Sequence, residues 1–369
     1  MPTLPPARAG DAVAAIDTPA LVVDLDAFER NLDLMANAVR GSGLTLRPHA
    51  KSHKCVEIAR AQVERGAIGI CCQKVAEAEV FVAAGIRDVL VTNEVVAAPK
   101  LARLAALAHR ATIGVLVDDV GNLAAISAAA GAAGATLDVL VEVDVGAHRC
   151  GVAPGAAAAL AVAIARAPGL TFRGIHAYHG AAQHLRTPAE RRAAIGAAVR
   201  DAAAAKAAIE AAGVRCPVVT GAGTGTWQEE RDSGVYTELQ PGSYVFMDAD
   251  YGRNALAPDQ HHFEHSLFVL TAVMSTAVAG QVVVDAGLKA LAFDSGPPQV
   301  YGAAGLEFTR ASDEHGVLAV EGPPPRLGDR LWLVPGHCDP TVNLHDWIVG
   351  VRGTRVECVW PVAARGALG

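Results

Sequence analysis

A glycine-rich run that directly follows an apolar, strand-like segment predicts an anion-binding loop. In TGAGTGT (220–226), Gly223 and Gly225 flank Thr224. Glycines let backbone N–H groups approach an anion closely, and the threonine hydroxyl can donate a further hydrogen bond. The run matches neither a Walker A loop nor a dinucleotide fingerprint. A flexible turn between a strand and a helix therefore explains the spacing alone equally well.

A basic segment, RPHAKSHK (47–54), holds the lysine best suited to bind an aldehyde. The lysines of the chain are at positions 51, 54, 74, 100, 206 and 289. A lysine that carries a phosphate-bearing aldehyde cofactor reacts as a free amine, which desolvation or nearby cations favour. Lys51 follows a strand-like run and has four basic neighbours: Arg47, His49, His53 and Lys54. A basic surface loop is the competing interpretation.

The segment VPGHCDPTVNLHDW (334–347) carries a histidine and an aspartate at a spacing typical of a metal site. In an extended chain, residues i and i+2 point to the same side, so His337 and Asp339 are expected to face one site while Cys338 faces away. Such a pair suits Mn²⁺, Mg²⁺ or Zn²⁺ and leaves positions for water and substrate. A turn stabilised by an Asp–Pro bend is the alternative.

The elements that position these residues form a repeating pattern. Eight β-branched runs alternate with Ala-rich segments of helical spacing; they span 44–50, 67–72, 88–93, 112–119, 137–144, 170–179, 216–221 and 236–242. Strands that alternate with helices pair in parallel, and eight such units predict an α/β fold, a (β/α)8 TIM-type barrel over residues 18–255. A doubly wound open sheet is the alternative, but its G-x-G-x-x-G after the first strand is missing.

Polar residues follow these runs where a barrel places its active site. Lys51, Gln73, Arg149 and Tyr178 come at or after the carboxyl ends of four runs. Barrel active sites are built on that face, and the loops after strands 7 and 8 commonly bind phosphate. TGAGTGT follows the seventh run and PGSY (241–244) follows the eighth. This placement favours the phosphate interpretation of the glycine loop.

The chain changes character after a polar linker near residues 254–265. Strand-like runs follow, separated by turns rich in Gly and Pro such as GPPPRLGD (322–329), with little helical periodicity. They predict a second, mainly β domain formed by residues 1–17 and 256–369, which carries His337 and Asp339. The sequence thus predicts a site between two domains.

Composition limits the classes of function. The formal net charge is -7, which gives no basic face for nucleic acid. The chain has seven cysteines without a C-x-x-C spacing, which favours a reducing compartment. We expect no secretory signal in MPTLPPARAG (1–10), and no apolar stretch reaches the ~20 residues of a membrane span. A cytoplasmic protein without a membrane or nucleic-acid partner is expected.

Taken together, the motifs resemble one family. RPHAKSHK, VEVDVGAHRCGV (141–152), TGAGTGT, ELQPGSYVFMDADYG (238–252) and PGHCDPTVNLHDW (335–347) are similar to segments of the D-threonine aldolase and 3-hydroxy-D-aspartate aldolase family. These are pyridoxal-phosphate (PLP) enzymes of the alanine-racemase type, fold type III, related to D-serine dehydratase. The resemblance spans residues 17 to about 365. It implies a PLP-binding barrel, a C-terminal β domain and a homodimer.

The resemblance also implies a role for individual residues. Lys51 matches the lysine that carries PLP, and His184 matches a histidine near the substrate hydroxyl. His337 and Asp339 match ligands of a divalent metal, with Mn²⁺ or Mg²⁺ favoured and Zn²⁺ possible. The remaining matches are cofactor contacts: Gln73, Arg149, Tyr178, Gly223, Thr224, Gly225, Gly242, Ser243 and Tyr251. One departure is Ala222, where the family pattern has glycine; we expect it to be tolerated.

The implied reaction is retro-aldol cleavage of a β-hydroxy-D-amino acid by a carbon–carbon lyase, with D-threonine as the leading small-molecule substrate. 3-Hydroxy-D-aspartate, cleaved to glycine and glyoxylate, is the alternative, and His148, Arg186 and Arg253 are candidate cations for its extra carboxylate. A dehydratase on the same scaffold is the competing enzyme, although that group tends to place Cys where this chain has Asp339. A racemase would leave the metal pair without a task, and a PLP carrier would lack the β domain.

Overall fold

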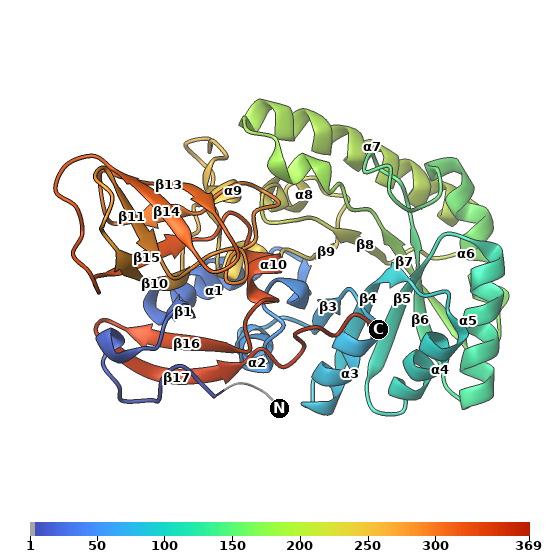
Figure 1. The fold of residues 1–369 in the computed structure, drawn as a ribbon. Helices are drawn as coiled ribbons and strands as arrows, with labels where there is room; N and C mark the ends of the chain where they lie inside the picture. Colours follow the sequence, from blue (N-terminus) through green and yellow to red (C-terminus); the bar gives the residue numbers. More distant parts are fainter. Residues whose placement is uncertain (1–3) are drawn as a thin grey trace.

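Two β-sheets organise the chain, of which the computed structural model describes residues 4–369 (Figure 1). One sheet has eight parallel strands in the order β2-β9-β8-β7-β6-β5-β4-β3. They are β2 (Thr45–Leu46), β3 (Ile70–Cys72), β4 (Asp88–Glu94), β5 (Thr112–Val117), β6 (Leu137–Glu142), β7 (Leu170–His176), β8 (Val218–Gly221) and β9 (Glu238–Leu239). Each strand overlaps one of the eight predicted runs.

The two ends of this strand order meet, so the sheet closes. The backbone N–H of Ile68 donates to the carbonyl of Leu46 at 2.9 Å, and that of Cys71 donates to the carbonyl of Pro48 at 2.8 Å. His49 and Cys71 form a parallel bridge at the same seam. The predicted (β/α)8 barrel is confirmed, and the open doubly wound sheet is wrong.

Helices surround the barrel (Figure 1). They are α1 (Leu25–Val39), α2 (Val56–Glu64), α3 (Val75–Ala83), α4 (Ala98–Leu107), α5 (Val120–Ala133), α6 (Ala157–Arg166), α7 (Pro188–Ala211) and α8 (Trp227–Arg231). The longest, α7, begins with a capping box in which Thr187 and Glu190 satisfy each other's backbone N–H groups. Among residues 4–369, none of the helices combines the length and the apolar character needed to cross a membrane.

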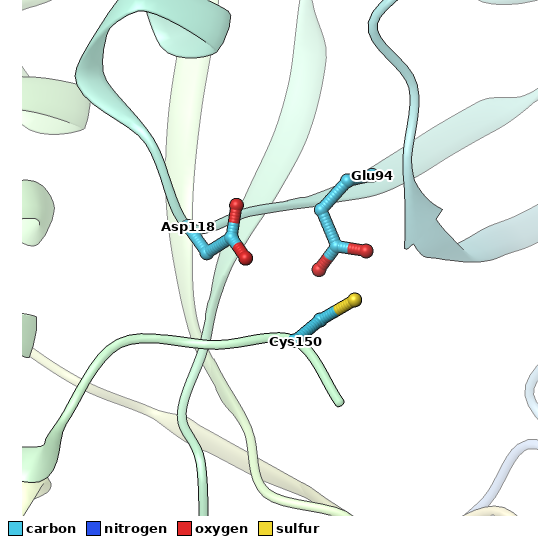
Figure 2. Close-up of side chains that lie close together, drawn as sticks. All are labelled: Glu94, Asp118 and Cys150. Carbon is cyan, nitrogen blue, oxygen red and sulfur yellow. The ribbon is translucent and has the colours of Figure 1, made fainter. Parts of the chain in front are cut away.

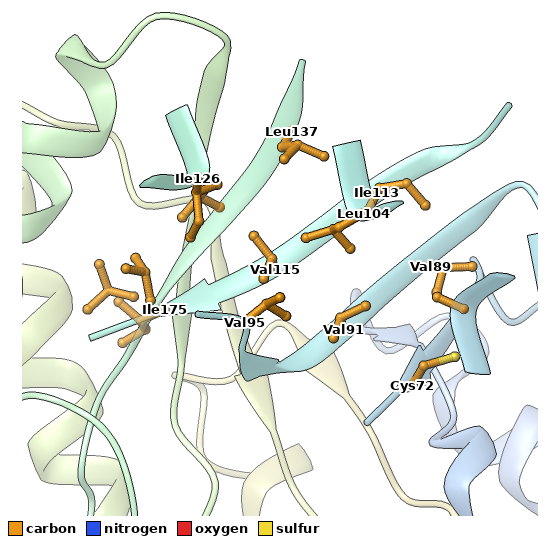
Figure 3. Close-up of a cluster of buried hydrophobic side chains, with 14 of the residues drawn as sticks. Cys72, Val89, Val91, Val95, Leu104, Ile113, Val115, Ile126, Leu137 and Ile175 are labelled. Atoms are coloured by element: carbon orange, nitrogen blue, oxygen red, sulfur yellow. The ribbon is translucent and has the colours of Figure 1, made fainter. Parts of the chain in front are cut away.

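The barrel core has two layers because successive strand residues face opposite sides. Val89 and Val91 of β4 pack outward with Leu104 of α4, as Figure 3 shows. Leu90, between them, joins Leu116 and other residues in a small cluster inside the barrel. Both faces of a parallel sheet are covered, which explains why these runs are almost uniformly apolar in the sequence.

The second sheet has nine strands, mostly from the C-terminal part of the chain. It contains β1 (Ala20–Asp24), β10 (Leu267–Ser275), β11 (Gln281–Val284), β12 (Gln299–Tyr301), β13 (Leu306–Ala311), β14 (Gly316–Val320), β15 (Arg330–Val334), β16 (Trp347–Arg352) and β17 (Arg355–Pro361). The predicted C-terminal, mainly β region is confirmed.

Strand β1 differs from the predicted boundary between the two domains. The predicted barrel range, 18–255, includes β1, but this strand belongs to the second sheet, where it pairs antiparallel with β10 and parallel with β16. The run ALVVD is buried along almost its whole length, as a barrel strand would be. The choice between the two sheets depends on long-range pairing, which a local apolar pattern does not reveal.

Short helices connect the two sheets near the pocket described below. They are α9 (Ala249–Gly252), α10 (Cys338–Val342) and the 3₁₀ turns η2 (Ala50–Ser52), η4 (Ala181–His184) and η5 (Ser243–Val245). Two further 3₁₀ turns are η1 (Val13–Ala15) and η3 (Pro154–Ala156). The turn η2 packs against α10, which brings the first barrel loop to the β domain.

Candidate active site

A pocket at the carboxyl ends of the barrel strands gathers the candidate residues. Its lining includes Lys51, Gln73, Arg149, Tyr178, His184, Gly223, Thr224, Gly242, Ser243, Tyr251, His337 and Asp339. Every predicted catalytic, cofactor and metal residue except Gly225 is therefore in one pocket. His337 and Asp339 come from the β domain and the others precede residue 256, so the pocket lies between the two parts of the chain.

Lys51 projects into this pocket from η2. Its Nζ lies 3.8 Å from Oδ2 of Asp339. Burial alone would lower the pKa of Lys51, but the charge of the Asp339 carboxylate and the nearby Tyr178 raise it above its ordinary value. The lysine is thus held close to a carboxylate on the opposite domain.

The basic neighbours of Lys51 do not form the cationic environment that the sequence predicts. Arg47 pairs with Asp88 at 2.5 Å and with Glu238 at 3.1 Å, and Lys54 pairs with Glu77 at 3.1 Å. These basic groups are satisfied by carboxylates elsewhere in the barrel. Sequence proximity was misleading here, because the partners lie between 23 and 191 positions away.

The glycine loop presents an unused donor to the pocket. Oγ1 of Thr224 is buried and has no hydrogen-bond partner among the described residues, although the pocket is directly in front of it. Gly223, Gly242 and Ser243 line the same end. A buried hydroxyl without a partner costs about 1–3 kcal/mol, so a ligand oxygen that accepts its hydrogen bond would remove that cost. The cradle fits a phosphate group.

Two details of this loop differ from expectation. Gly225 does not line the pocket, since its N–H donates to Oε1 of Gln183 at 2.9 Å. Ala222 has a φ of +70°, a left-handed conformation that favours glycine. That conformation explains why the family pattern has glycine there and shows that alanine is accommodated with some strain.

Arg149, Gln73 and two tyrosines line the rest of the pocket. No hydrogen bond or ion pair to the Arg149 guanidinium is found within residues 4–369, so it is free to bind an anionic group. Gln73 is held by its Nε2, which donates to the carbonyl of Thr92 at 3.1 Å. Burial raises the pKa of Tyr178 and of Tyr251, so both phenols stay protonated at neutral pH.

The sequence missed a buried histidine at the base of the pocket. Nδ1 of His176 pairs with Glu142, and its Nε2 lies 3.0 Å from Oε1 of Gln240. Burial opposes the charged form, but the Glu142 carboxylate raises the pKa of His176 above its ordinary value. The Glu142 carboxylate beside Nδ1 thus favours the protonated form of the His176 ring. Polar residues at inward positions of apolar strands were the available signal.

His184 lies at the rim of the pocket and is held by one carboxylate. Its Nδ1 contacts Oδ2 of Asp250, and its ring centre is 5.4 Å from that of Tyr251. Because an ionised carboxylate only accepts hydrogen bonds, Nδ1 carries the proton and Nε2 is free to accept one. This is the arrangement of a general base.

The metal candidates differ in local structure from the prediction. His337 is the extended N-cap of α10, and Asp339 lies in the first turn of that helix, so the expected extended chain is wrong. Both residues nevertheless line the pocket while Cys338 is buried. Nδ1 of His337 lies 2.6 Å from Oδ2 of Asp294. A carboxylate on one ring nitrogen leaves the other, Nε2, for a metal.

A second group of ligand-type side chains lies outside the pocket lining. Glu94, Asp118 and Cys150 have ligand atoms within 4.8 Å of one another, and Figure 2 shows the three side chains pointing together. The pKa of Glu94 is raised by burial and by the nearby Glu142 and Asp118 carboxylates. Metal-binding experiments must therefore separate this cluster from His337 and Asp339.

The cations suggested for a second substrate carboxylate do not line the pocket. His148 is exposed and pairs with Asp144 at 2.9 Å. Arg186 and Arg253 both donate to Asp250. These three residues are therefore engaged with protein carboxylates, two of them beside His184.

Comparisons with known proteins identify the family of the chain. A model of the alanine racemase N-terminal domain matches residues 23–250, and a serine dehydratase domain model matches residues 266–351. D-threonine aldolase of an Arthrobacter species is 51% identical over 365 residues, covering 98% of this chain and 96% of that protein. 3-Hydroxy-D-aspartate aldolase of Paracoccus denitrificans is 50% identical over 368 residues, covering 98% and 95%. The chain belongs to this aldolase family.

Solved structures support the membership in the aldolase family. D-threonine aldolase from Filomicrobium marinum has a TM-score of 0.97 and 52% identity, with coverage of 99% of this chain and 100% of that one. D-threo-3-hydroxyaspartate dehydratase from Delftia sp. HT23 is more distant, with a TM-score of 0.86 and 30% identity over 95% of this chain and 98% of that one. A cysteine mutant of D-threo-3-hydroxyaspartate dehydratase, in the metal-free form, has a TM-score of 0.84 and 30% identity over the same shares of the two chains.

Proposed function

We propose that the protein cleaves the Cα–Cβ bond of β-hydroxy-D-amino acids, with PLP and a divalent metal as cofactors. D-threonine, which would give glycine and acetaldehyde, is the leading substrate. The observation that carries the proposal is the meeting of Lys51, His184, His337 and Asp339 in one pocket. An amine, a base and a metal pair are the groups that this cleavage needs.

PLP would be held by Lys51, with its phosphate at Thr224, Gly223, Gly242 and Ser243. The unpartnered hydroxyl of Thr224 and the free guanidinium of Arg149 fit a bound anionic cofactor. When bound, PLP supplies an electron sink for the electron pair that remains on Cα after the bond breaks. The family membership of the chain supports this cofactor.

The divalent metal would be held by Nε2 of His337 and by Asp339. Lewis acidity there lowers the pKa of the substrate hydroxyl. An oxygen and a nitrogen donor favour Mn²⁺ or Mg²⁺, with Zn²⁺ as a further possibility. The Asp294 carboxylate on Nδ1 of His337 supports the assignment, since metal-binding histidines commonly have such a partner.

The chain's own residues then divide the work. His184 takes the proton of the β-hydroxyl on Nε2, and the bond between Cα and Cβ breaks as the aldehyde forms. Arg149 neutralises the negative charge of a bound ligand. The protonated phenols of Tyr178 and Tyr251 donate hydrogen bonds to the oxygen atoms of that ligand. Glu142, buried beside Nδ1 of His176, holds that ring in place in the lining of the pocket.

Two related activities are weighed against D-threonine cleavage. A relative with 50% identity is a 3-hydroxy-D-aspartate aldolase, so that substrate is the second candidate. A dehydratase is less well supported. Structures of D-threo-3-hydroxyaspartate dehydratase exist with a histidine mutated and with a cysteine two positions later mutated. In this chain, the residue two positions after His337 is Asp339, a hard oxygen donor in place of sulfur.

The location and assembly stay predictions. All seven cysteines are free, which supports a reducing compartment such as the cytoplasm. A homodimer is expected from the family resemblance. Light scattering coupled to size-exclusion chromatography tests the dimer directly, and a monomer mass would contradict it.

Product analysis tests the proposed function. Purified protein with PLP and Mn²⁺ is incubated with D-threonine, with a chelator-treated sample in parallel. Glycine and acetaldehyde that disappear on chelation are the expected result. Ammonia and 2-oxobutanoate would identify a dehydratase, and turnover of 3-hydroxy-D-aspartate alone would identify the second candidate.

A matched set of variants assigns the metal. His337→Ala and Asp339→Ala should each abolish the metal-dependent activity and remove one bound Mn²⁺, as measured by equilibrium metal analysis. Glu94→Gln, in the cluster outside the pocket, should leave both unchanged. The opposite result would be loss of activity in Glu94→Gln with activity retained in His337→Ala and Asp339→Ala. It would show that the catalytic metal binds at the Glu94 cluster, and it would contradict the assignment.

A further inference from the structure

One carboxylate joins a histidine and two arginines at the rim of the pocket. Asp250, in α9, contacts Nδ1 of His184 through Oδ2. Its Oδ1 accepts hydrogen bonds from Arg186 at 2.5 Å and from Arg253 at 2.6 Å. The Asp250 side chain is 7% exposed, whereas that of His184 is 44% exposed. The Asp250 carboxylate is thus buried, whereas the His184 ring is partly exposed.

The charge on Asp250 is secure. Burial raises the pKa of a carboxyl, but hydrogen bonds from Arg253 and Arg186 and the nearby His184 lower the pKa of Asp250 to about 2. Asp250 therefore stays an acceptor across the working range of the enzyme. An acceptor at Nδ1 keeps the imidazole proton on that nitrogen and directs Nε2 toward the pocket.

Asp250 is also connected, through Arg253, to the proposed metal ligands on the β domain. Arg253 also donates to the carbonyl of Ser295 at 2.8 Å. The next residue toward the N-terminus is Asp294, whose carboxylate lies 2.6 Å from Nδ1 of His337. A chain of contacts thus runs from His184 through Asp250, Arg253 and the 294–295 loop to His337.

We propose that Asp250 is a positioning residue for His184. It holds the histidine as a base with Nε2 free and, through Arg253, fixes the distance of that base from the metal pair. The inference rests on the proposed aldol cleavage, in which His184 takes the β-hydroxyl proton while the metal polarises the same oxygen. Both groups must meet one substrate atom, so their separation needs a rigid link.

The other groups around His184 do not supply this link. Tyr251 meets the His184 ring only in a tilted aromatic contact, and Arg186 and Arg253 reach His184 through Asp250. The charged groups across the pocket are Lys51, Arg149, His337 and Asp339. None of them forms a hydrogen bond to His184 within the described part of the chain.

Asp250→Asn is the direct test. The amide can present its NH₂ group to Nδ1, which moves the imidazole proton to Nε2 and disables the base. We expect kcat to fall by about 10- to 100-fold, the usual effect of losing such a partner, with little change in KM. Asp232→Asn, at an exposed carboxylate paired with Arg231, is the control and should behave as wild type.

Two further measurements separate positioning from folding. In a His184→Ala background, Asp250→Asn should cause no additional loss of kcat, because Asp250 acts through His184. A further loss of the same fold would overturn the proposal. Arg253→Met keeps both Asp250 and His184, and should lower kcat by about 10-fold if the link to the β domain matters. An unchanged kcat in this variant would overturn that part.

A spectroscopic readout makes the test independent of turnover. The N–H proton of His184 should give a downfield NMR signal that is absent in His184→Ala and lost or shifted in Asp250→Asn. If the wild-type protein cleaves no β-hydroxy-D-amino acid but shows this signal, the proposed function fails and the positioning survives. If the protein is active and Asp250→Asn matches wild type in rate and in this signal, the positioning role is wrong.

Discussion

Asp294 lies against His337, with 2.6 Å between Oδ2 of the aspartate and Nδ1 of the histidine. The two residues are 43 positions apart and come from separate loops of the β domain. The contact fixes the ring so that Nε2 points into the pocket. A carboxylate in this position also makes a histidine a stronger ligand, since it stabilises positive charge on the ring.

Removal of this carboxylate should weaken metal binding without abolishing it. We expect Asp294→Asn to lower the affinity for Mn²⁺ by about 10- to 100-fold, the usual effect of losing such a partner. Titration with Mn²⁺, followed by isothermal calorimetry, measures the change. Asp313→Asn, at an exposed aspartate of the same domain, is the control. Equal affinities in the two variants would show that Asp294 does not support a metal ligand.

The unpartnered hydroxyl of Thr224 leads to a prediction about the cofactor. Thr224→Val keeps the shape of the side chain and removes the donor. The affinity for PLP should fall by about 10- to 150-fold, which corresponds to roughly 1.5–3 kcal/mol for one hydrogen bond to a charged group. Fluorescence titration of the apoprotein with PLP measures this. Thr224→Ser restores a hydroxyl and should recover most of the affinity, and a valine variant with wild-type affinity would contradict a phosphate at this loop.

Much of the site could be predicted because its residues follow strands. Lys51, Gln73 and Thr224 each come directly after a parallel strand, and the barrel brings all such ends to one face. The local sequence is therefore sufficient to predict that these side chains lie in a common pocket. The alternation of apolar runs and Ala-rich segments likewise defined the barrel.

The parts that escaped prediction depend on long-range pairing. His184 and Asp250 are 66 positions apart, and His176 and Gln240 are 64 apart. Nothing in either local sequence indicates its partner. The expected extended chain at His337 was wrong for a different reason, since a short helix begins at Cys338 and the spacing of two residues fits both a strand and a helix N-terminus.

His53 gives the fold a specific sensitivity to acid. The side chain is fully buried, and burial lowers its pKa to about 4 even though the N–H of Cys55 donates to Nδ1 at 3.1 Å. In the unfolded chain the pKa returns to its ordinary value near 6.5, so the unfolded state binds more protons between pH 4 and 6.5. The free energy of unfolding should therefore fall as the pH drops through this window, by up to about 3 kcal/mol from this residue.

His53→Asn removes that titration while its Oδ1 can still accept from Cys55. Urea unfolding at pH 7 and at pH 4.5 should show a smaller loss of stability in the variant than in the wild-type protein. Other groups titrate in both proteins. The informative quantity is therefore how much more free energy of unfolding the wild-type protein loses between pH 7 and pH 4.5 than the variant does. An equal loss of stability in the two proteins would show that His53 has the same pKa in the native and unfolded states.

Gly174 is required by a close backbone approach inside the barrel. It adopts a φ of +148°, and a Cβ atom built at this position would lie 1.9 Å from the carbonyl oxygen of Val218 in the neighbouring strand. The strands β7 and β8 cannot move apart without breaking the register that aligns Gly174 with Val218. Gly174→Ala should therefore destabilise the protein by about 3 kcal/mol or more, as overpacking in a rigid core does. Gly155→Ala, where nothing lies within 4 Å of the added Cβ, should change stability by no more than about 1 kcal/mol. Chemical denaturation of both variants measures the difference, and similar stabilities would mean that the two strands separate more easily than their hydrogen bonds indicate.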